Sequence, residues 1–386
     1  MKDYQTHVFT STYTADVSGV CSAMYELGGM SVIHDPSGCN STYSTHDEPR
    51  WFDGKSLMFI SGLDEMTAVL GDDEVIIKDI AAAAADLKPE FITLCGGSIP
   101  HIIAFDFKGT AHLIEKRCNI PVVPVPTDGL KSYISGVGMA LTEWIKRFAD
   151  VKVQKTPELS VNLMGVTPLD FSINGNVEKM RETFEKAGIK VNCCAAMGES
   201  FESMRKLYAA HVNVVVSSAG RRPARYMEKT GGIPRVEGLP IGEAEAGKLI
   251  KAVREAASDG KNKIVYDEAL EHEDWEIPGD GILVIGEEVF ALSLADSINE
   301  LPESERHGLK AYAIWPDVDE GLPEEQLMEA VKRSKMVIAD PLYKVIPHDK
   351  AIKFIDFPHE AYSGRIYRKQ IPVFATDEFD TAKLIK

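Results

Sequence analysis

The chain has 386 residues, and at roughly 150 residues per domain this length allows two or three domains. Hydrophobic residues make up 44% of it and charged residues 26%, which is the balance of an ordinary globular protein. The net charge of -17 argues against nucleic acid and anionic membrane surfaces as partners, because both are themselves negatively charged.

The cysteines are best interpreted together with the expected compartment. The amino terminus, MKDYQTHVFTSTYTADVSG, lacks the apolar core of a secretory signal, and no run approaches the roughly 18 apolar residues of a membrane span. We therefore expect a soluble, cytoplasmic protein. Thiols stay reduced in the cytoplasm, so the six cysteines predict metal binding or redox chemistry rather than a disulfide framework.

Apolar, β-branched runs alternate with helical patterns along the whole chain, which predicts an α/β fold with parallel sheets. We expect a first domain over residues 1–150. Its predicted strands are Ser31–His34, Leu57–Ser61, Phe91–Cys95 and Val122–Val125. Its predicted helices are Val75–Leu87, Gly109–Arg117 and Ile134–Phe148. The polar, proline-containing stretch 150–158 is typical of a linker.

Two further blocks repeat this pattern, over residues 151–278 and 279–386. The second has a predicted helix at Val177–Ala187 and strands at Val161–Val166, Lys190–Cys194 and Asn213–Ser217. The third has predicted strands at Ile282–Ile285, Ala311–Trp315, Met336–Ala339 and Phe354–Phe357. The sequence thus predicts three doubly wound, Rossmann-like α/β domains.

A phosphate-loop pattern in the second block is misleading. Residues 242–248, GEAEAGK, match G-x4-G-K, but Leu249 stands where a Ser or Thr should reach magnesium. The two glutamates inside the pattern would also repel phosphate. We interpret the segment as the first turn of a helix, and we expect no ATP hydrolysis by this chain.

Three cysteines of the first block lie close to predicted strand ends, where open α/β sheets bind ligands. Cys39 follows the strand Ser31–His34, Cys95 closes the strand Phe91–Cys95, and Cys21 lies upstream. Thiolates from separate loops suit an iron–sulfur cluster better than a zinc finger. The spacing alone equally allows three inert, buried thiols.

The sequence segments around these cysteines indicate a family. The segments SVIHDPSGC, GLDEMTAVLGDDEVIIKDI and ITLCGGSIPHIIAFDF resemble the component 1 subunits of nitrogenase and their relatives. The likeness continues at AHVNVVVSSAGRRPARYMEKTGGIPRVEGLPIG and at FIDFPHEAYSGRIY, so it covers nearly the whole chain.

This resemblance implies three α/β domains around a central cleft, and a dimer with an iron–sulfur cluster at the subunit interface. The cluster would be 4Fe-4S or a larger type, held by Cys21, Cys39 and Cys95, with hydrogen bonds from the amides of Gly96 and Gly97. The second subunit would be an identical chain or a paralogue. A separate ATP-dependent iron protein would dock and deliver electrons.

The sequence also departs from nitrogenase. There, an iron–molybdenum cofactor is held by a Cys after the strand matching Asn213–Ser217 and by a His near the chain's end. Here Ser217 and Ser218 stand at the first position, and His359 falls near the second. Hydroxyls are poor iron ligands, so we expect no iron–molybdenum cofactor bound in this manner.

Several other residues are candidates for substrate or proton chemistry. Ser217 and Ser218, with Arg221, Arg222 and Arg225 after them, could bind a substrate's carboxylate or phosphate groups, although such arginines are often simply solvated. His359 and His101 are candidate proton donors. We expect hydrogen-bonding roles for His34 and His46, and buried core positions for Cys193 and Cys194. Cys118 is expected to pack before a strand.

Three functions follow from these observations. The first is a reductase that passes electrons through the cluster to a small-molecule substrate, which the sequence does not identify. The second is a scaffold of the same fold on which a metallocluster is assembled. The third is a metal-free small-molecule binding protein.

Overall fold

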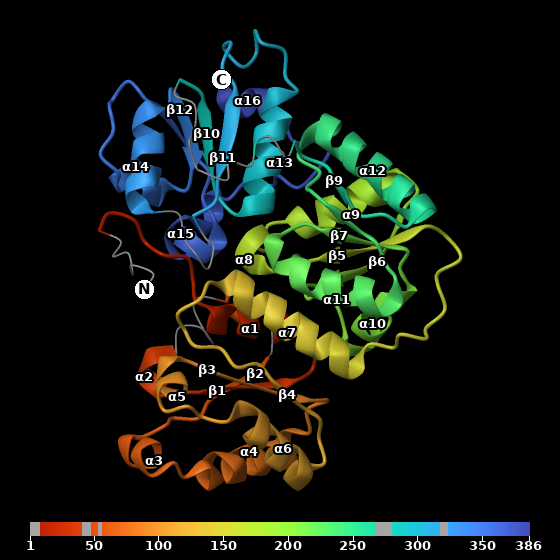
Figure 1. The fold of residues 1–386 in the computed structure, drawn as a ribbon, viewed down its shortest axis with the longest axis vertical. Helices are drawn as coiled ribbons and strands as arrows, with labels where there is room; N and C mark the ends of the chain where they lie inside the picture. Colours follow the sequence, from red (N-terminus) through yellow and green to blue (C-terminus); the bar gives the residue numbers. More distant parts are fainter. Residues whose placement is uncertain (1–7, 41–47, 53–55, 268–269, 271–279, 317–322) are drawn as a thin grey trace.

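The computed structural model describes residues 8–40, 48–52, 56–267, 270, 280–316 and 323–386, and for residues 39 and 40 only the backbone. Three parallel sheets with helices packed around them form the molecule (Figure 1). The α/β prediction is confirmed. No described helix has the length and apolar character needed to cross a membrane.

The first sheet has the strand order β2-β1-β3-β4. Its strands are β1 (Met30–His34), β2 (Leu57–Ile60), β3 (Ile92–Gly96) and β4 (Val122–Pro124). The accompanying helices are α1 (Asp16–Met24), α2 (Ser37–Asn40), α3 (Glu65–Leu70), α4 (Asp73–Leu87), α5 (Ser98–Ile102), α6 (Phe107–Cys118) and α7 (Tyr133–Phe148), with the 3-10 turn η1 (Pro49–Phe52). All of β1 and β3 is buried, as expected for a parallel sheet covered on both faces.

The second sheet has the strand order β6-β5-β7-β8-β9. Its strands are β5 (Ser160–Met164), β6 (Lys190–Ala195), β7 (Val212–Val215), β8 (Arg235–Glu237) and β9 (Lys263–Ile264). Its helices are α8 (Pro168–Phe171), α9 (Asn176–Lys186), α10 (Phe201–Arg205), α11 (Arg221–Gly231) and α12 (Gly242–Asp259), with the turns η2 (Leu207–Ala209) and η3 (Ser218–Gly220).

The third sheet has the strand order β11-β10-β12-β13. Its strands are β10 (Ile282–Ile285), β11 (Ala311–Ile314), β12 (Met336–Ala339) and β13 (Lys353–Asp356). Its helices are α13 (Glu288–Asn299), α14 (Glu324–Arg333), α15 (Glu360–Tyr367) and α16 (Thr381–Ile385), with the turns η5 (Pro341–Val345) and η6 (Arg368–Gln370).

The three sheets share one topology. In each, the first strand in the sequence lies between the second and the third, so the second and third strands are added on opposite sides of the first. Ligand sites of open α/β sheets lie outside the carboxyl ends of the strands at this switch point. The fold therefore provides three switch points: β1 with β3, β5 with β7, and β10 with β12.

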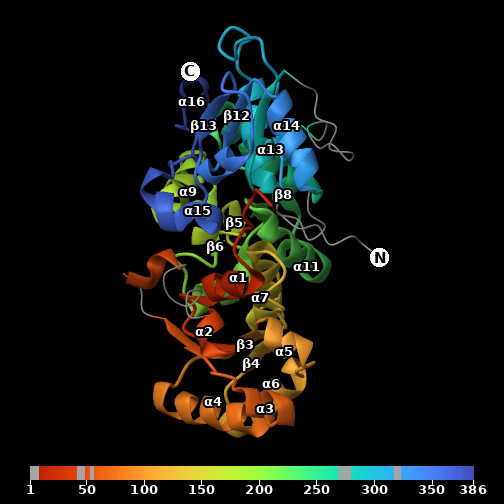
Figure 2. The same ribbon diagram turned by 90° about the vertical axis from the view of Figure 1, so that its left-hand side faces the viewer.

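Helices α1 and α7 lie between the first sheet and the other two (Figures 1 and 2). They pack backbone against backbone, because Gly19 and Gly136 lie at their contact. A Cβ atom on Gly136 would lie 1.9 Å from the Asp16 carbonyl oxygen, and one on Gly19 would lie 2.2 Å from that of Tyr133. Only glycine permits this approach.

Two terminal segments cross between sheets. Residues 8–15, here called the N-terminal strap, run from the third sheet's α14 to the start of α7. The backbone N–H groups of Val8, Phe9 and Thr10 donate to the Glu324 carboxylate at 2.7, 2.8 and 2.7 Å. At the other end, the Tyr133 N–H donates to the Thr14 carbonyl at 2.8 Å. The strap thus fastens the first part of the chain to the third sheet.

The C-terminal segment returns to the second sheet. The Asn176 Oδ1 atom, at the start of α9, accepts from the N–H groups of Phe374 and Ala375 at 2.8 and 3.0 Å. The expected boundary between residues 278 and 279 lies outside the described residues. The other expected boundary falls in the segment between α7 and β5, where residues 150–158 form neither helix nor strand.

Candidate active site and cysteine pair

Cys21 and Cys95 meet in the core of the first sheet. Cys21 lies on α1, and Cys95 lies on β3; both are fully buried. We predicted that Cys95 is the final residue of its strand, but β3 continues for one more residue, Gly96. The Cys95 thiol hydrogen bonds to Cys21, and this contact, with burial, raises the pKa of Cys95 well above its ordinary value. Two thiols from different elements therefore converge near the carboxyl end of β3.

Cys39 reaches the same edge through its backbone. It lies in α2, which follows β1, and β1 pairs in parallel with β3. Its side chain lies outside the described part of the structure. His46 lies there as well.

The glycines after Cys95 have roles within the chain itself. The Gly96 N–H donates to Thr127 Oγ1 at 3.0 Å, so this amide is already engaged. A Cβ atom on Gly96 would lie 2.6 Å from the Phe107 ring, so packing alone demands glycine there. Gly97 precedes the first residue of α5 as its N-cap.

The remaining cysteines and histidines of interest lie apart from this pair. His34 is buried, its Nδ1 atom lies 2.8 Å from Ser61 Oγ, and burial lowers its pKa to about 4. Cys193 and Cys194 are buried on β6, as expected. Cys118 is half-buried at the end of α6, shortly before β4. His101 is exposed on α5.

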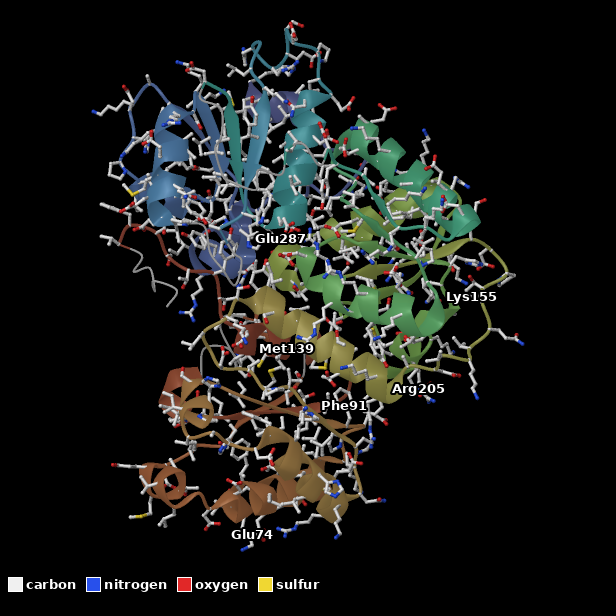
Figure 3. The ribbon with its side chains drawn as sticks, viewed as in Figure 1. Glu74, Phe91, Met139, Lys155, Arg205 and Glu287 are labelled. Carbon is white, nitrogen blue, oxygen red and sulfur yellow. The ribbon has the colours of Figure 1, made fainter. Side chains whose placement is uncertain are left out.

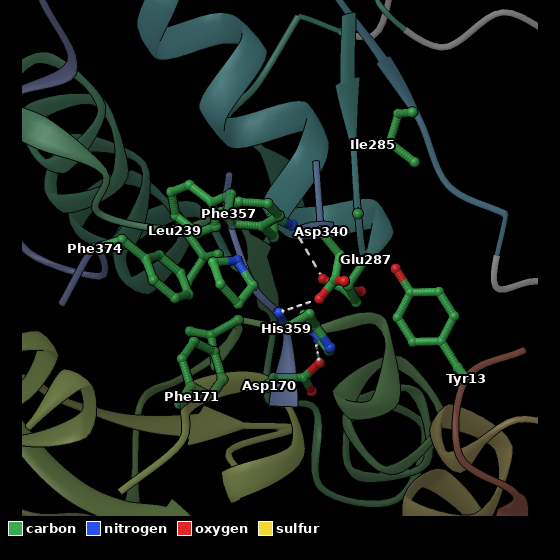
Figure 4. A pocket seen from close by; sticks show the side chains of 14 residues that line it. Tyr13, Asp170, Phe171, Leu239, Ile285, Glu287, Asp340, Phe357, His359 and Phe374 are labelled. Atoms are coloured by element: carbon green, nitrogen blue, oxygen red, sulfur yellow. Dashed lines mark hydrogen bonds and ion pairs between the residues drawn. The ribbon is translucent and has the colours of Figure 1, made fainter. Parts of the chain in front are cut away.

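A second constellation lies where the second and third sheets face one another (Figure 4). Three of its polar lining residues follow strands at two switch points: Asp170 follows β5, Glu287 follows β10 and Asp340 follows β12. The fourth, His359, follows β13, the strand at the edge of the third sheet. Tyr13 of the N-terminal strap completes the polar lining. The other described lining residues are Phe171, Val216, Leu239, Ile285, Gly286, Phe290, Phe357, Pro358 and Phe374.

This pocket is narrow and central. Figure 3 places Glu287 near the middle of the molecule, between α13 and α8. The free space within the pocket has a volume of about 10 Å³, close to what one water molecule needs.

Asp170 and His359 form the centre of the pocket. The Asp170 Oδ1 atom accepts a short hydrogen bond from the Tyr133 hydroxyl and lies 3.3 Å from His359 Nε2. Burial alone would lower the pKa of His359, but Asp170, Asp340 and Glu287 together raise it. In the described part of the chain, Asp170 Oδ2 and His359 Nδ1 are buried without a hydrogen-bond partner.

Glu287 and Asp340 have both oxygens satisfied. Glu287 accepts from the N–H groups of Ser218 at 2.8 Å and Phe290 at 3.0 Å. Burial, and then the charge of Asp170, raises its pKa to about 7. Asp340 accepts from the N–H groups of Leu342 and His359 at 2.9 and 2.8 Å. The two carboxylates thus hold the loops that carry the pocket.

Only some of the predicted substrate-binding residues lie near this pocket. Ser217 Oγ accepts from the Ala219 N–H, and the Ser218 N–H reaches Glu287, so both serines lie beside the pocket. Arg222 and Arg225 are exposed on α11.

Arg221, a weak candidate for binding a substrate's anionic groups, is paired with carboxylates of the protein itself. Its guanidinium pairs with Glu237, and with Glu288 at 2.5 and 2.7 Å. Burial would lower the pKa of Arg221, but these two carboxylates raise it. The side chain is therefore held within the protein.

Lys248, the lysine of the phosphate-loop pattern, binds carboxylates of the protein itself. Helix α12 begins at Gly242, as predicted, and Lys248 lies 2.8, 2.9 and 2.6 Å from Glu245, Asp296 and Glu300. These acids are the one metal-like carboxylate group found among the described residues, and the ammonium of Lys248 contacts all three.

Sequence reasoning missed three carboxylates, Asp170, Glu287 and Asp340, and the tyrosines Tyr13 and Tyr133. A usable signal existed for the carboxylates. They come soon after the strands β5, β10 and β12, so the strand-end rule that selected the cysteines would have selected them. No local pattern marks the tyrosines, because their roles depend on packing between distant segments.

Comparison with known proteins identifies the family of this sequence. The sequence model of the family described as nitrogenase component 1 type oxidoreductase matches residues 18–275. A light-independent protochlorophyllide reductase subunit from Chlorobium limicola is 26% identical over 243 residues, 61% of this chain and 43% of that protein. The corresponding subunit from Chlorobium phaeobacteroides is 39% identical over 102 residues, 26% of this chain and 19% of that protein. The chain thus spans less than half the length of these relatives.

Solved structures agree on the fold. Nitrogenase Cp1 at pH 5 superposes with a TM-score of 0.66 at 15% identity, over 100% of this chain and 89% of that one. Nitrogenase Cp1 at pH 6.5 gives a TM-score of 0.65, also at 15% identity, over 93% and 88% of the two chains. Because the family model covers well over half of the sequence, the chain belongs to the nitrogenase component 1 type oxidoreductases.

Proposed function

We propose that this chain is a subunit of a nitrogenase-like reductase. Cys21, Cys39 and Cys95 would hold an iron–sulfur cluster at the interface with a second subunit, identical or paralogous. A partner ATP-dependent iron protein would supply low-potential electrons, and a small-molecule substrate would be reduced in the pocket around His359. The meeting of Cys21 and Cys95 carries this proposal.

The cysteine pair fits an iron–sulfur cluster. The two thiols touch although they come from α1 and β3, and α2 brings the backbone of Cys39 to the same sheet edge. When bound, the cluster supplies one-electron transfer. The protein contributes the thiolates and an apolar surrounding, with Val20, Ile33 and Val137 in the same buried core.

The edge that carries the cysteines also has the character of an interface. Helix α3 follows β2 at this edge and has no buried residue, and Met66, Val69 and Leu70 on it are all largely exposed. Helix α5 follows β3, and its Ile102 is 74% exposed. Apolar surface gathered in this way is typical of a protein–protein contact. It supports a cluster shared between subunits.

The pocket supplies an acid. His359 is held by Asp170, whose charge favours the protonated imidazolium, and Tyr133 donates to the same carboxylate. This arrangement can keep a proton at His359 for transfer to a reduced substrate. Exposed His101 is not among the described lining residues, so His359 is the stronger candidate of the two.

Iron and acid-labile sulfide, measured per chain on protein purified without oxygen, test the proposal. About two irons per chain would fit one 4Fe-4S cluster shared across a dimer, and about four or more would fit one per chain or a larger cluster. Cys95→Ala should lose most of the iron, whereas Cys193→Ala, which removes another buried thiol, should keep it. Wild-type protein that stays free of iron after reconstitution would refute the proposal. Molybdenum should be absent.

The assembly scaffold is the second candidate. The small pocket favours it, because a space of about 10 Å³ admits no substrate larger than water without movement. Turnover with an added iron protein and a reductant would support the reductase. Cluster transfer to an apo-protein without turnover would support the scaffold.

A further inference from the structure

We propose that the pocket at Asp170 binds a small cationic hydrogen-bond donor of the ammonium or protonated-amine class. The inference deepens the proposed function and rests on it only where this ligand is taken as the substrate. Binding itself requires neither the cluster nor the partner.

The charge of the lining carries the first step. Three carboxylates, Asp170, Glu287 and Asp340, face one imidazole, and none of the described lining residues is Lys or Arg. Arg221, the nearest candidate for binding an anion, is held by Glu237 and Glu288 instead. The pocket therefore repels anions and attracts a positive charge.

One unsatisfied atom indicates where a ligand would bind. The side chain of Asp170 is only 5% exposed, and its Oδ2 atom has no donor in the described structure, whereas Oδ1 is bound by Tyr133 and His359. Both oxygens of Glu287 and Asp340 already accept backbone N–H groups. A buried carboxylate oxygen without a donor is costly, so a ligand that donates to Asp170 Oδ2 gains this energy on binding.

The size of the cavity and its aromatic walls further restrict the class of ligand. The cavity of about 10 Å³ suits a group the size of water or ammonium. Its walls include the rings of Phe171, Phe290, Phe357 and Phe374, whose faces attract a desolvated cation. A larger amine could enter only with its ammonium head in the pocket and its remainder outside.

Calorimetric titration of the purified, cluster-loaded protein with methylammonium chloride tests the inference. Sodium chloride at equal ionic strength controls for salt, methanol for size, and acetate for charge sign. Methylammonium should bind saturably, and the three controls should not. Asp170→Asn should weaken binding about tenfold or more, because the isosteric amide removes the charge. Asp356→Asn, at the exposed end of β13, should bind like wild type.

The pH dependence gives a second readout. Glu287, Asp340 and Tyr13 face the Asp170–His359 pair within the pocket, and Tyr133 faces it from α7. As pH falls from 8 to 6, Glu287 gains a proton, since its pKa is about 7, and His359 becomes more positive. Methylammonium should therefore bind more weakly at pH 6 than at pH 8.

Several outcomes overturn the inference. Equal responses to methylammonium and sodium chloride would show that the cavity holds water only. Stronger binding of acetate, or methylammonium binding unaffected by Asp170→Asn, would show that the pocket at Asp170 is not a site for cations. If Asp170→Asn fails to fold, the ligand comparison on wild-type protein still decides. If the protein binds iron and turns over a neutral substrate but does not bind methylammonium, the inferred ligand class is refuted and the proposed function is not. If it binds methylammonium but no iron, the proposed function is refuted and the inferred cation site is not.

Discussion

At the scale of single residues, the ionisation of His359 is set by its neighbours. Replacing Asp170 by Asn removes the carboxylate that pairs with Nε2, which leaves burial as the main influence. We predict that the pKa of His359 falls in Asp170→Asn. Titration of the imidazole carbon resonances by NMR measures it. His211, bound to Ser160 in the second sheet, serves as an internal control whose pKa should not move. An unchanged His359 would contradict the pairing.

The candidate site was only partly predictable from residue types. Cysteines near strand ends are conspicuous, and so Cys21 and Cys95 could be predicted to meet. Asp170 and Glu287 also follow strands, but aspartate and glutamate are common on surfaces, so this position alone carries a weaker signal for them than it does for the cysteines. The pairing of Arg221 could not be predicted either, because its partner Glu288 lies on α13 of the third sheet and no local pattern reveals the contact.

At the scale of elements, the α1–α7 contact depends on glycine. Gly136→Ala would place a methyl group against the Asp16 carbonyl, and such overpacking costs about 1–3 kcal/mol. Gly247→Ala is the matched control: it is exposed on α12 with nothing within 4 Å of the new Cβ atom, so it should stabilise by about 0.5–1 kcal/mol. Urea unfolding measures both. Equal effects of the two substitutions would contradict the close contact.

The N-terminal strap gives a prediction with a defined pH range. Burial would raise the pKa of Glu324, but the N–H groups of Val8, Thr10 and Phe9 lower it to about 2. A carboxylate with a lowered pKa stabilises the fold above its unfolded value, here 4.5, and this stabilisation is lost as pH falls toward 2.

We predict that Glu324→Gln lowers the free energy of unfolding by roughly 1–3 kcal/mol at pH 7. The difference from wild type should shrink between about pH 4.5 and pH 2. Denaturant unfolding across this range measures it, and hydrogen exchange at Val8, Phe9 and Thr10 should rise in the variant at pH 7. A difference that does not change with pH would contradict the role of the carboxylate charge.

The elements themselves were largely predictable, because apolar strands and capped helices are local features. Every strand predicted in the first and third blocks was found within about one residue. The short helices α2, α3 and α5 were not predicted. Each has six residues or fewer, so its sequence shows no helical period, and its position depends on the strand that precedes it.

At the scale of the whole molecule, the exposed apolar helices predict association. Leu70→Asp on α3 places a charge in the proposed interface, because Leu70 is 70% exposed, and should shift the protein toward monomer. Leu113→Asp, on α6 and 50% exposed, is the matched control and should leave association unchanged. Sedimentation velocity measures the distribution. Equal shifts for both variants would argue against an interface at α3.

The strap also has a consequence for synthesis on the ribosome. Val8, Phe9 and Thr10 are among the first described residues to emerge, but their acceptor, Glu324, follows 314–316 positions later. At about 5–20 residues per second, these N–H groups wait on the order of 15–60 s for their partner. The strap can close only after α14 has been made, so a segment translated more than 300 residues before its partner is among the last to reach its native place.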